Sequence, residues 1–502
     1  MNEKRLELVR GLGAWGSMAI VVGTMIGTGI FLKPAETARE GRTVSVVFAA
    51  WIVGAVLSLF GALAYAELGA AIPEAGGEYV YLRRGFGPVW GFLFGWMHSI
   101  VGRPASAASI AAGLMRFLGF LIPAVGAPIF VLHIRSPFGM ALAQPYDFIF
   151  TWAQPLAVLW LVAMTGINYL GVRLGGGVQV VLTALKVGSV AAIIALALGA
   201  PAAHFSTVHP SFWLDRIGAG TFSAFLAALA AALWAYDGWE DLNLVGSEVA
   251  EPQRNIPRAL VGGVAFVAAV YLLFNVACLH ILPFGDVAAS QHVASDVVQR
   301  ISGRGAADWI TLAMVIAALG SMNSSVLSGA RVPYAMARDG LFFRVARGVH
   351  PRYRTPGRAL IFQCVLASFM ALTGTFEELT SLFIFAGWIF YGLAVVAMFR
   401  LRRTAPDLPR PYRCWGYPWV PGLFVAGALA LTVSIWLDRP VRSSIGLRSF
   451  FPVWSSIAAG AAARWQCPTE CEGCNVALRC SAAGDGRSAI QKVLGPGLLE
   501  GS

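Results

Sequence analysis

The sequence predicts an all-α polytopic membrane protein with two related halves. Of the 502 residues, 57% are hydrophobic and only 13% are charged, whereas soluble domains carry about 25% charged residues. Apolar runs long enough to cross a bilayer as helices recur along the chain. The first and the sixth of these runs are interrupted by residues that disfavour a helix, so we expect one broken helix in each half.

The apolar segments are expected to cross the membrane once each. They lie at about 12–33, 44–72, 87–122, 149–172, 177–199, 219–247, 258–283, 306–334, 358–375, 379–401 and 417–437. A twelfth segment at about 445–465 is weaker, so we expect about 11–12 transmembrane helices.

These segments divide the chain into a short tail, a membrane domain and a second tail. Residues 1–11 form the N-terminal tail, residues 12–445 the membrane domain and residues 446–502 an irregular C-terminal tail. Within the domain, helices 1–5 cover about 12–199, helices 6–10 about 219–401 and helix 11 about 417–437.

Basic residues set the expected orientation. They gather at the N-terminus and after even-numbered segments, as with Arg344 and Arg347 after segment 8 and Arg402 and Arg403 after segment 10. Cytoplasmic loops of membrane proteins are enriched in such residues. We therefore expect a cytoplasmic N-terminus in a plasma (inner) membrane protein. We attribute the net charge of +11 to topology and expect no nucleic-acid partner.

The first interruption is Gly23–Phe31, in segment 1. It holds three glycines and two threonines, which are poor helix formers. In a bilayer, an unwound backbone is tolerated only where it is buried in protein or lines a cavity. The stretch therefore predicts either a binding site at mid-membrane depth or close packing of small residues against another helix.

The second interruption lies late in segment 6, where Asp237, Gly238, Glu240 and Asp241 follow an apolar run. Carboxylates inside a span are costly and mark function or a water-filled cavity; the alternative is that the helix ends there. Interrupted helices at matching places in two halves are typical of inverted-repeat transporters. Such breaks suit a zwitterion, because a half-helix N-terminus attracts a carboxylate and a half-helix C-terminus an ammonium.

Lys186 is the third unusual feature. It lies near the middle of segment 5, in a chain with only four lysines. An ammonium at this depth must find carbonyls, a carboxylate or water, or lose its proton. The alternative is that its side chain reaches an interface.

Several motifs resemble the amino acid–polyamine–organocation superfamily, and within it the L-type amino acid transporters and their bacterial relatives. They cover about residues 10 to 445 in family order: Gly23–Phe31, Tyr65–Gly69, Pro73–Tyr79, Glu248–Arg258 and Gly320–Ser324. The resemblance implies a LeuT-type 5+5 inverted-repeat fold, with helices 1 and 6 broken.

The resemblance also implies roles for individual residues. Backbone amides of Thr28, Gly29 and Ile30 would bind the substrate carboxylate. Carbonyls near the two breaks would bind the ammonium, and an aromatic residue of segment 6 would cover the substrate. The substrate-binding set implied in this way is Thr24, Met25, Gly27, Thr28, Gly29, Ile30, Trp234, Ala235, Tyr236 and Asp237.

In sodium-coupled relatives of this fold, a Na⁺ joins segment 1 to segment 8, and in L-type members a segment 5 lysine stands in its place. Lys186 matches that lysine, with partners expected near Gly23 and Ser321. The resemblance therefore implies secondary transport of amino acids without sodium, by exchange or with a proton, through alternating access. A neutral substrate is favoured. The alternatives are a cationic amino acid or polyamine, or a sensor that binds amino acids without transport.

Other features carry weaker signals. The histidines show no metal-ligand spacing and no catalytic set is visible, so we expect neither an enzyme nor a metal or other cofactor. The loop from about 123 to 146 lacks the cysteine that bonds a heavy subunit in eukaryotic L-type transporters. A reading-frame change near Leu447 is one interpretation of the tail, and a zinc site at its four cysteines is another.

Overall fold

The structure is a computed structural model that describes residues 8–134, 146–201, 219–374 and 376–438. These residues belong to the first of two compact units, Met1–Ser443. The predicted twelfth segment and residues 446–502, with their four cysteines, lie outside the described residues, so the expectations for them stay predictions.

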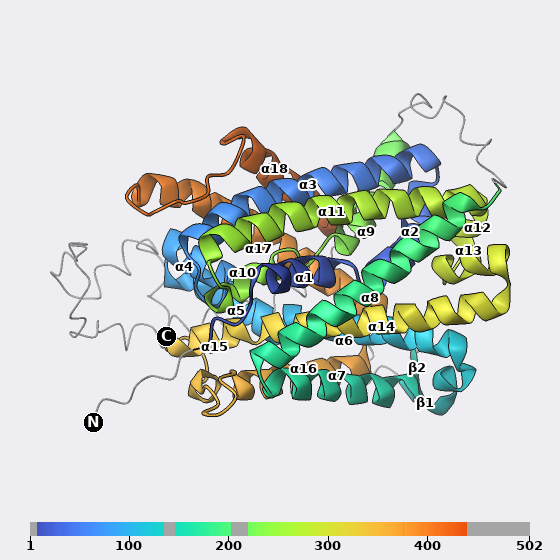
Figure 1. Cartoon of the computed structure of the whole chain (residues 1–502), viewed down its shortest axis with the longest axis horizontal. Helices are drawn as coiled ribbons and strands as arrows, with labels where there is room; N and C mark the ends of the chain where they lie inside the picture. The colour runs from blue at the N-terminus through green and yellow to red at the C-terminus, as the bar shows by residue number, and fades with distance from the viewer. Residues whose placement is uncertain (1–7, 135–145, 202–218, 375, 439–502) are drawn as a thin grey trace, which may run out of the picture. The chain divides into compact units, whose positions relative to one another are not determined.

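Helices account for most of the described chain (Figure 1). Their bounds are α1 Ala14–Met25, α2 Thr28–Gly41, α3 Val44–Ala71, α4 Glu78–Phe86, α5 Pro88–Met97, α6 Arg103–Leu121, α7 Ala153–Tyr169, α8 Val172–Gly199, α9 Ala219–Ala235, α10 Asp241–Leu244, α11 Pro252–Ile281, α12 Phe284–Ala289, α13 Val293–Ser302, α14 Arg304–Gly329, α15 Arg331–Arg338, α16 Gly357–Thr373, α17 Phe376–Thr404 and α18 Trp419–Asp438.

The helices confirm a polytopic membrane protein. Within the described residues, 6 helical stretches are long and apolar enough to cross a bilayer. Further apolar helices are shorter, and every predicted segment from 12–33 to 417–437 contains a helix. The long stretches are Ala14–Gly41, Val44–Ala71, Pro88–Leu121, Val172–Gly199, Pro252–Ile281 and Arg304–Arg338.

Segment 1 is broken where its glycines are densest. Helix α1 ends at Met25 and α2 begins at Thr28, with Ile26 and Gly27 outside helical geometry. The Ser321 side chain lies so close to Gly27 that any Cβ there would collide with it. The break therefore combines weak helix propensity with a close approach from α14.

Segment 6 is broken after Ala235. The chain turns through residues 236–240 before α10 begins at Asp241. Gly238 has a φ of +100°, which glycine adopts without the steric cost that other residues would incur. The Thr24 side chain packs against the same glycine, at the place where a Cβ would stand.

Segment 3 contains a π-helical turn. Helix α5 passes into a π-helical turn, His98–Gly102, before α6 begins at Arg103. Such turns are rare and often occur at functional sites. This one directs His98 and Arg103 toward the centre of the bundle, where both are buried.

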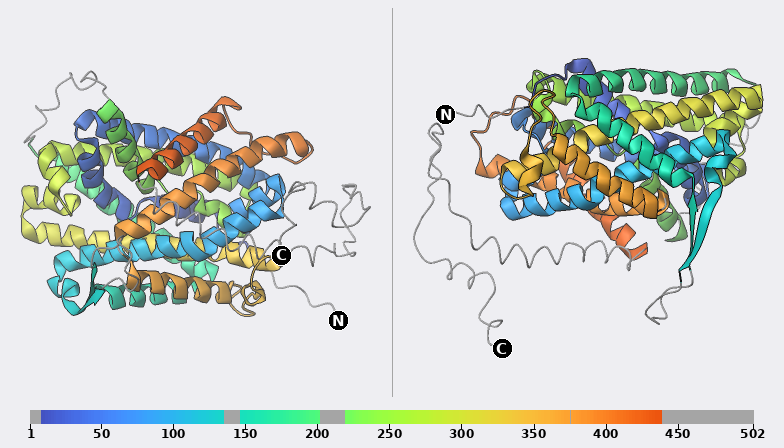
Figure 2. Two further views of the ribbon diagram at one scale, coloured as in Figure 1. Left: turned by 180° about the vertical axis from the view of Figure 1, so that it is seen from behind. Right: turned by 90° about the horizontal axis from the view of Figure 1, so that it is seen from below.

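The all-α expectation was wrong for one loop. Strands β1 (Pro128–Ile134) and β2 (Tyr146–Thr151) form an antiparallel hairpin in which Val131 faces Ile149. Both strands are rich in aromatic and β-branched residues, which favour a pleated backbone. The hairpin extends away from the helices in the right-hand view of Figure 2.

Helices from predicted segments 1–5 pack on helices from predicted segments 6–10: α2 on α9, α3 on α11 and α6 on α14. Figure 1 shows α3 and α11 side by side over much of their length. The broken helix α1 lies among α8, α10, α11 and α14, so both interruptions are inside the bundle.

Candidate functional site

The two interruptions meet at a backbone contact. A Cβ built on Gly29 would lie 3.0 Å from Ala235 Cα and 3.2 Å from the Trp234 ring. Glycine permits this approach without displacing its neighbours, and the contact joins the first turn of α2 to the last turn of α9. The site therefore lies where one helix begins and two others, α1 and α9, end.

These helix ends have complementary polarity. Thr28, Gly29 and Ile30 are in the first turn of α2, where amides have no partner within their own helix and the helix dipole is positive. Helices α1 and α9 end at Met25 and Ala235, where carbonyls are left over and the dipole is negative. Opposite charges of one small molecule fit such an arrangement.

A tyrosine hydroxyl connects the two carbonyl ends. Tyr271 of α11 hydrogen-bonds to Met25 O and, at 2.9 Å, to Ala235 O. Both are carbonyls near the breaks, the groups expected to bind an ammonium. The same ring packs on Tyr236, with 5.0 Å between the ring centroids. Tyr271 was absent from the predicted set, and it ties both interruptions to α11.

One cation lies over Trp234, an aromatic residue of segment 6 in the predicted substrate-binding set. Lys33 Nζ of α2 is 4.8 Å from the centroid of the Trp234 ring, a cation–π geometry. Lys33 also forms an ion pair with Glu36. The Trp234 ring of α9 therefore packs against Lys33 of α2.

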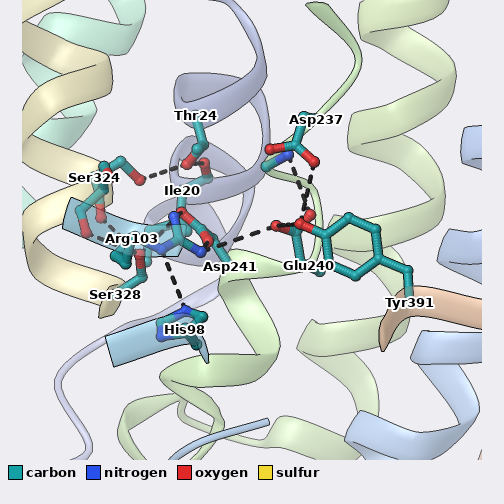
Figure 3. Close-up of polar contacts among 12 residues, drawn as sticks. Ile20, Thr24, His98, Arg103, Asp237, Glu240, Asp241, Ser324, Ser328 and Tyr391 are labelled. Carbon is teal, nitrogen blue, oxygen red and sulfur yellow. Dashed lines mark hydrogen bonds and ion pairs between the residues drawn. The ribbon is translucent and has the colours of Figure 1, made fainter. Parts of the chain in front are cut away.

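Hydroxyl groups line the other side of the first interruption. Thr24 Oγ1 donates to Ile20 O at 2.7 Å and hydrogen-bonds with Ser324 of α14 (Figure 3). Ser321, one turn earlier on α14, lies against Gly27 and donates to Ile26 O at 3.4 Å. Helix α14 therefore braces the end of α1 and the start of α2.

Lys186 lies at the same junction and is fully buried. Its Nζ donates to Gly23 O and, at 3.2 Å, to Ser321 Oγ. The structure thus brings together α8, α1 and α14 around a single ammonium. Whether this lysine replaces a sodium ion stays a prediction.

A second buried cation, Arg103, lies nearby in an acidic cluster. It forms an ion pair with Asp241 through both terminal nitrogens, and one of these bonds, Nη1 to Oδ2, is 3.0 Å long. Asp241 also accepts a hydrogen bond from Ser328 Oγ at 2.9 Å. Figure 3 shows the guanidinium between segment 6 and α14. The acids of segment 6 are therefore inside the bundle rather than at an interface.

The rest of the cluster centres on Tyr391 of α17. Its hydroxyl lies 2.7 Å from Glu240 Oε1 and 3.1 Å from Asp237 Oδ1. Glu240 also accepts from the Gly238 amide at 3.1 Å, and Arg103 Nε donates to His98 Nε2 at 3.3 Å. Asp237, left unexplained by the sequence, therefore points toward Tyr391.

The end of the bundle that carries the N-terminus is closed by backbone and ionic contacts. The Leu12 amide donates to Glu248 O at 3.0 Å, and the Ala250 amide donates to Leu12 O at 2.8 Å. The side chains of Arg331 and Glu248, both buried, form an ion pair at 2.7 Å. These contacts hold α1, segment 6 and α15 together.

Sequence reasoning did not select three residues that organise this site: Arg103, Tyr271 and Tyr391. Arg103 carried a usable signal, because an arginine within an apolar segment marks function or a buried partner. The two tyrosines carried none, since a tyrosine in a span is also common at interfaces.

A sequence model of amino acid permeases matches residues 12–461. The chain belongs to the amino acid permease family. Members of this family, and the relatives of this permease, are transporters rather than enzymes.

Curated relatives align with this permease over most of their own length. It is 34% identical to the serine/threonine exchanger SteT of Bacillus subtilis over 433 residues, which are 85% of this chain and 91% of that protein. It is 32% identical to the human b(0,+)-type amino acid transporter 1 over 412 residues, 82% and 80% of the two chains. It is 30% identical to the mouse large neutral amino acids transporter small subunit 2 over 445 residues, 88% and 79% of the two chains.

Proposed function

We propose that this permease exchanges neutral amino acids across the membrane, without sodium, by alternating access. The observation that carries the proposal is the meeting of the interruptions at Gly29 and Ala235. There the first turn of α2 offers amides to a carboxylate, and the carbonyl ends of α1 and α9 offer oxygens to an ammonium. Tyr271 positions the two carbonyl ends.

The names of the relatives support exchange and a neutral substrate. One is a serine/threonine exchanger and another transports large neutral amino acids.

The proposed fold is the LeuT-type 5+5 inverted repeat. A two-fold axis relating segments 1–5 to segments 6–10 brings equivalent helices together. The observed packing of α2 on α9, α3 on α11 and α6 on α14 supports this symmetry. With basic linkers on one side, the N-terminus is cytoplasmic and the membrane is the plasma (inner) membrane. We propose no disulfide-linked heavy subunit.

Sodium independence is proposed from Lys186. Its ammonium bonds to Gly23 O and Ser321 Oγ, and so supplies a positive charge between α1 and α14. A cation at that position would compete with the lysine for the same oxygens.

Counterflow into proteoliposomes loaded with unlabelled amino acid tests the proposal. A panel of labelled neutral, cationic and acidic amino acids is offered in sodium buffer and in choline buffer at one pH. We expect accumulation of neutral amino acids at equal rates in both buffers. Accumulation that collapses in choline contradicts sodium independence, and binding without accumulation favours a sensor.

A cationic amino acid or polyamine is the second candidate, and Asp237 favours it. This carboxylate is only partly buried and stands in the interruption of segment 6. If it binds a substrate cation, Asp237→Asn should abolish arginine counterflow and spare serine counterflow. If only neutral amino acids are the substrates, the wild type should show serine counterflow and no arginine counterflow.

A further inference from the structure

A small cavity lies beside the acidic cluster, outside the candidate substrate site. Glu78, His98, Arg103, Glu240 and Tyr391 are among its lining residues, and its volume of about 10 Å³ is the smallest that admits one water. Helices α4, α6 and α17, the π-helical turn and segment 6 all contribute to its wall. The cavity is therefore at a junction of both halves.

Glu78 is the residue that the surrounding structure leaves unexplained. It is 1% exposed, and neither carboxyl oxygen receives a hydrogen bond from another described residue. A buried carboxylate without donors is costly, whereas a protonated carboxyl is much less so. Burial, reinforced by the nearby Glu240 carboxylate, raises the pKa of the Glu78 carboxyl well above its usual range.

Of the other acids in the cluster, Asp241 and Glu240 accept hydrogen bonds on both oxygens, whereas Asp237 accepts one from Tyr391. Both oxygens of Asp241 are bonded, to Arg103 and Ser328. Both oxygens of Glu240 are bonded too, to Tyr391 and to the Gly238 amide. A carboxylate that accepts on both oxygens is stabilised as an anion. One guanidinium thus faces these two anions, and a third anion at Glu78 would have no compensating charge.

We propose that this cavity is a proton-binding site, with the proton held by Glu78 beside Glu240 while the N-terminal end of the bundle is closed. The step is the transfer of one proton from water to the Glu78 carboxylate, and its return to water on opening. A metal cation is a poorer occupant, because it needs several free oxygen ligands and those of Asp241 and Glu240 are already used.

The location of Glu78 connects its proton to closure. The Gly76 amide donates to Leu244 O at 2.9 Å, and Tyr81 OH donates to Asn243 Oδ1 at 3.1 Å. These bonds fasten α4 to segment 6 on either side of Glu78. If α4 separates from segment 6, water reaches Glu78 and the proton is released. This link between proton release and opening rests on the proposed function.

The titratable groups that face Glu78 come from every helix packed around it except α5, which has none. They are Tyr65 of α3, Tyr81 of α4, His98 of the π-helical turn, Arg103 of α6, Glu240 and Asp241 of segment 6, and Tyr391 of α17.

Thermal unfolding of the full chain in detergent, from about pH 5 to about pH 8, tests the site without requiring transport. Because the folded pKa is raised, the stability from Glu78 is complete below the unfolded pKa and is lost as pH rises toward the folded one. Glutamine cannot ionise. The midpoint of Glu78→Gln relative to wild type should therefore increase as the pH is raised. A difference that stays constant, or decreases, overturns the proposal.

Two further measurements keep the test decisive. Glu74→Gln, an exposed carboxylate in the preceding loop, is the matched control and should not show the widening difference. If Glu78→Gln does not fold, infrared difference spectra of the wild type should show a protonated carboxyl that disappears as pH rises, and Glu240→Gln should move that change to lower pH. Absence of the band overturns the proposal.

Counterflow separates the proton site from the proposed function. Wild-type exchange should fall as pH rises, because the closed state loses its proton, and Glu78→Gln should lose this dependence. Equal pH dependence in both proteins overturns the coupling and leaves amino acid exchange intact. No counterflow in the wild type overturns the proposed function, and the thermal result still decides the proton site.

Discussion

Two buried cations, Lys186 and Arg103, stand close to the interruptions but have different partners. Lys186 bonds to a carbonyl and a hydroxyl, and among the described residues no carboxylate forms an ion pair with it. Arg103 is paired with Asp241 and lies 3.9 Å from Glu240. A cation with neutral partners can be removed without exposing a buried anion, whereas removal of Arg103 leaves carboxylates unpaired.

The difference in bonding partners indicates different roles for Lys186 and Arg103. Lys186 joins three helices at the proposed substrate site, so its loss should affect transport more than folding. Arg103 offsets the negative charge of the acids in segment 6, and this allows the segment to stay inside the bundle. The loss of Arg103 should therefore affect folding before transport. Substitution of each by methionine, which is similar in length and uncharged, compares them directly.

The largest expected effect is that of Arg103→Met. It leaves Asp241 buried and unpaired, which typically costs about 3–5 kcal/mol. We expect a large drop in folded yield and in the thermal midpoint in detergent. Arg254→Met, at an exposed pair with Glu251, should change the midpoint little. Equal decreases in the thermal midpoint of the two variants would show that the buried ion pair stabilises the fold no more than the exposed one.

Lys186→Met should fold but exchange amino acids much more slowly than the wild type. A hydrogen bond to a charged group contributes about 1.5–3 kcal/mol, so we expect counterflow to fall by about tenfold or more. The thermal midpoint should fall less than for Arg103→Met. Leu185→Met, at the exposed neighbour on α8, is the control. Wild-type counterflow in Lys186→Met would remove this residue from the mechanism.

Tyr271→Phe should weaken substrate binding by an intermediate amount. It removes the hydroxyl shared by Met25 O and Ala235 O, and a typical hydrogen bond contributes about 0.5–1.5 kcal/mol. We expect the half-saturating substrate concentration to rise about twofold to tenfold. Tyr65→Phe is the control, because it loses a buried hydroxyl without a partner among the described residues. Its half-saturating substrate concentration should stay near the wild-type value.

Ser321→Ala should have the smallest effect of the series. Lys186 keeps its bond to Gly23 O and loses only the hydroxyl of α14, which is worth about 1 kcal/mol. A reduction in counterflow of a few-fold is expected. Ser325→Ala, one turn further along α14 with a buried hydroxyl that has no described partner, should exchange normally. Identical behaviour of the two serine variants would show that Ser321 does not support the lysine.

The sequence predicted the helical segments and the two interruptions because both depend on local composition. Gly23, Gly27 and Gly29 weaken a helix wherever they occur, and long apolar runs require helices in a bilayer. The position of Lys186 within segment 5 was also readable, since a lysine so far from either interface needs internal partners.

The remaining features depend on which helices meet and how each is rotated. Arg103 and Asp241 are 138 residues apart, and nothing local in either segment indicates the other. The hydroxyl of Tyr271 reaches two carbonyls only because α11 lies beside both interruptions. Strands Pro128–Ile134 and Tyr146–Thr151 were not predicted, because an all-α fold was expected and segment 4 was assigned a helix from about residue 149.

The most direct test of the account is counterflow by Gly29→Val, because the contact of Gly29 with Ala235 defines the proposed substrate site. Valine would force its side chain against Ala235 Cα, where a Cβ alone would already lie at 3.0 Å. Gly188→Val on α8 is the control, because a Cβ there would meet nothing within 4 Å. We predict that the wild type and Gly188→Val exchange neutral amino acids in choline buffer and that Gly29→Val, at the same folded yield, does not. Exchange by Gly29→Val at the wild-type rate would contradict substrate binding between the two broken helices.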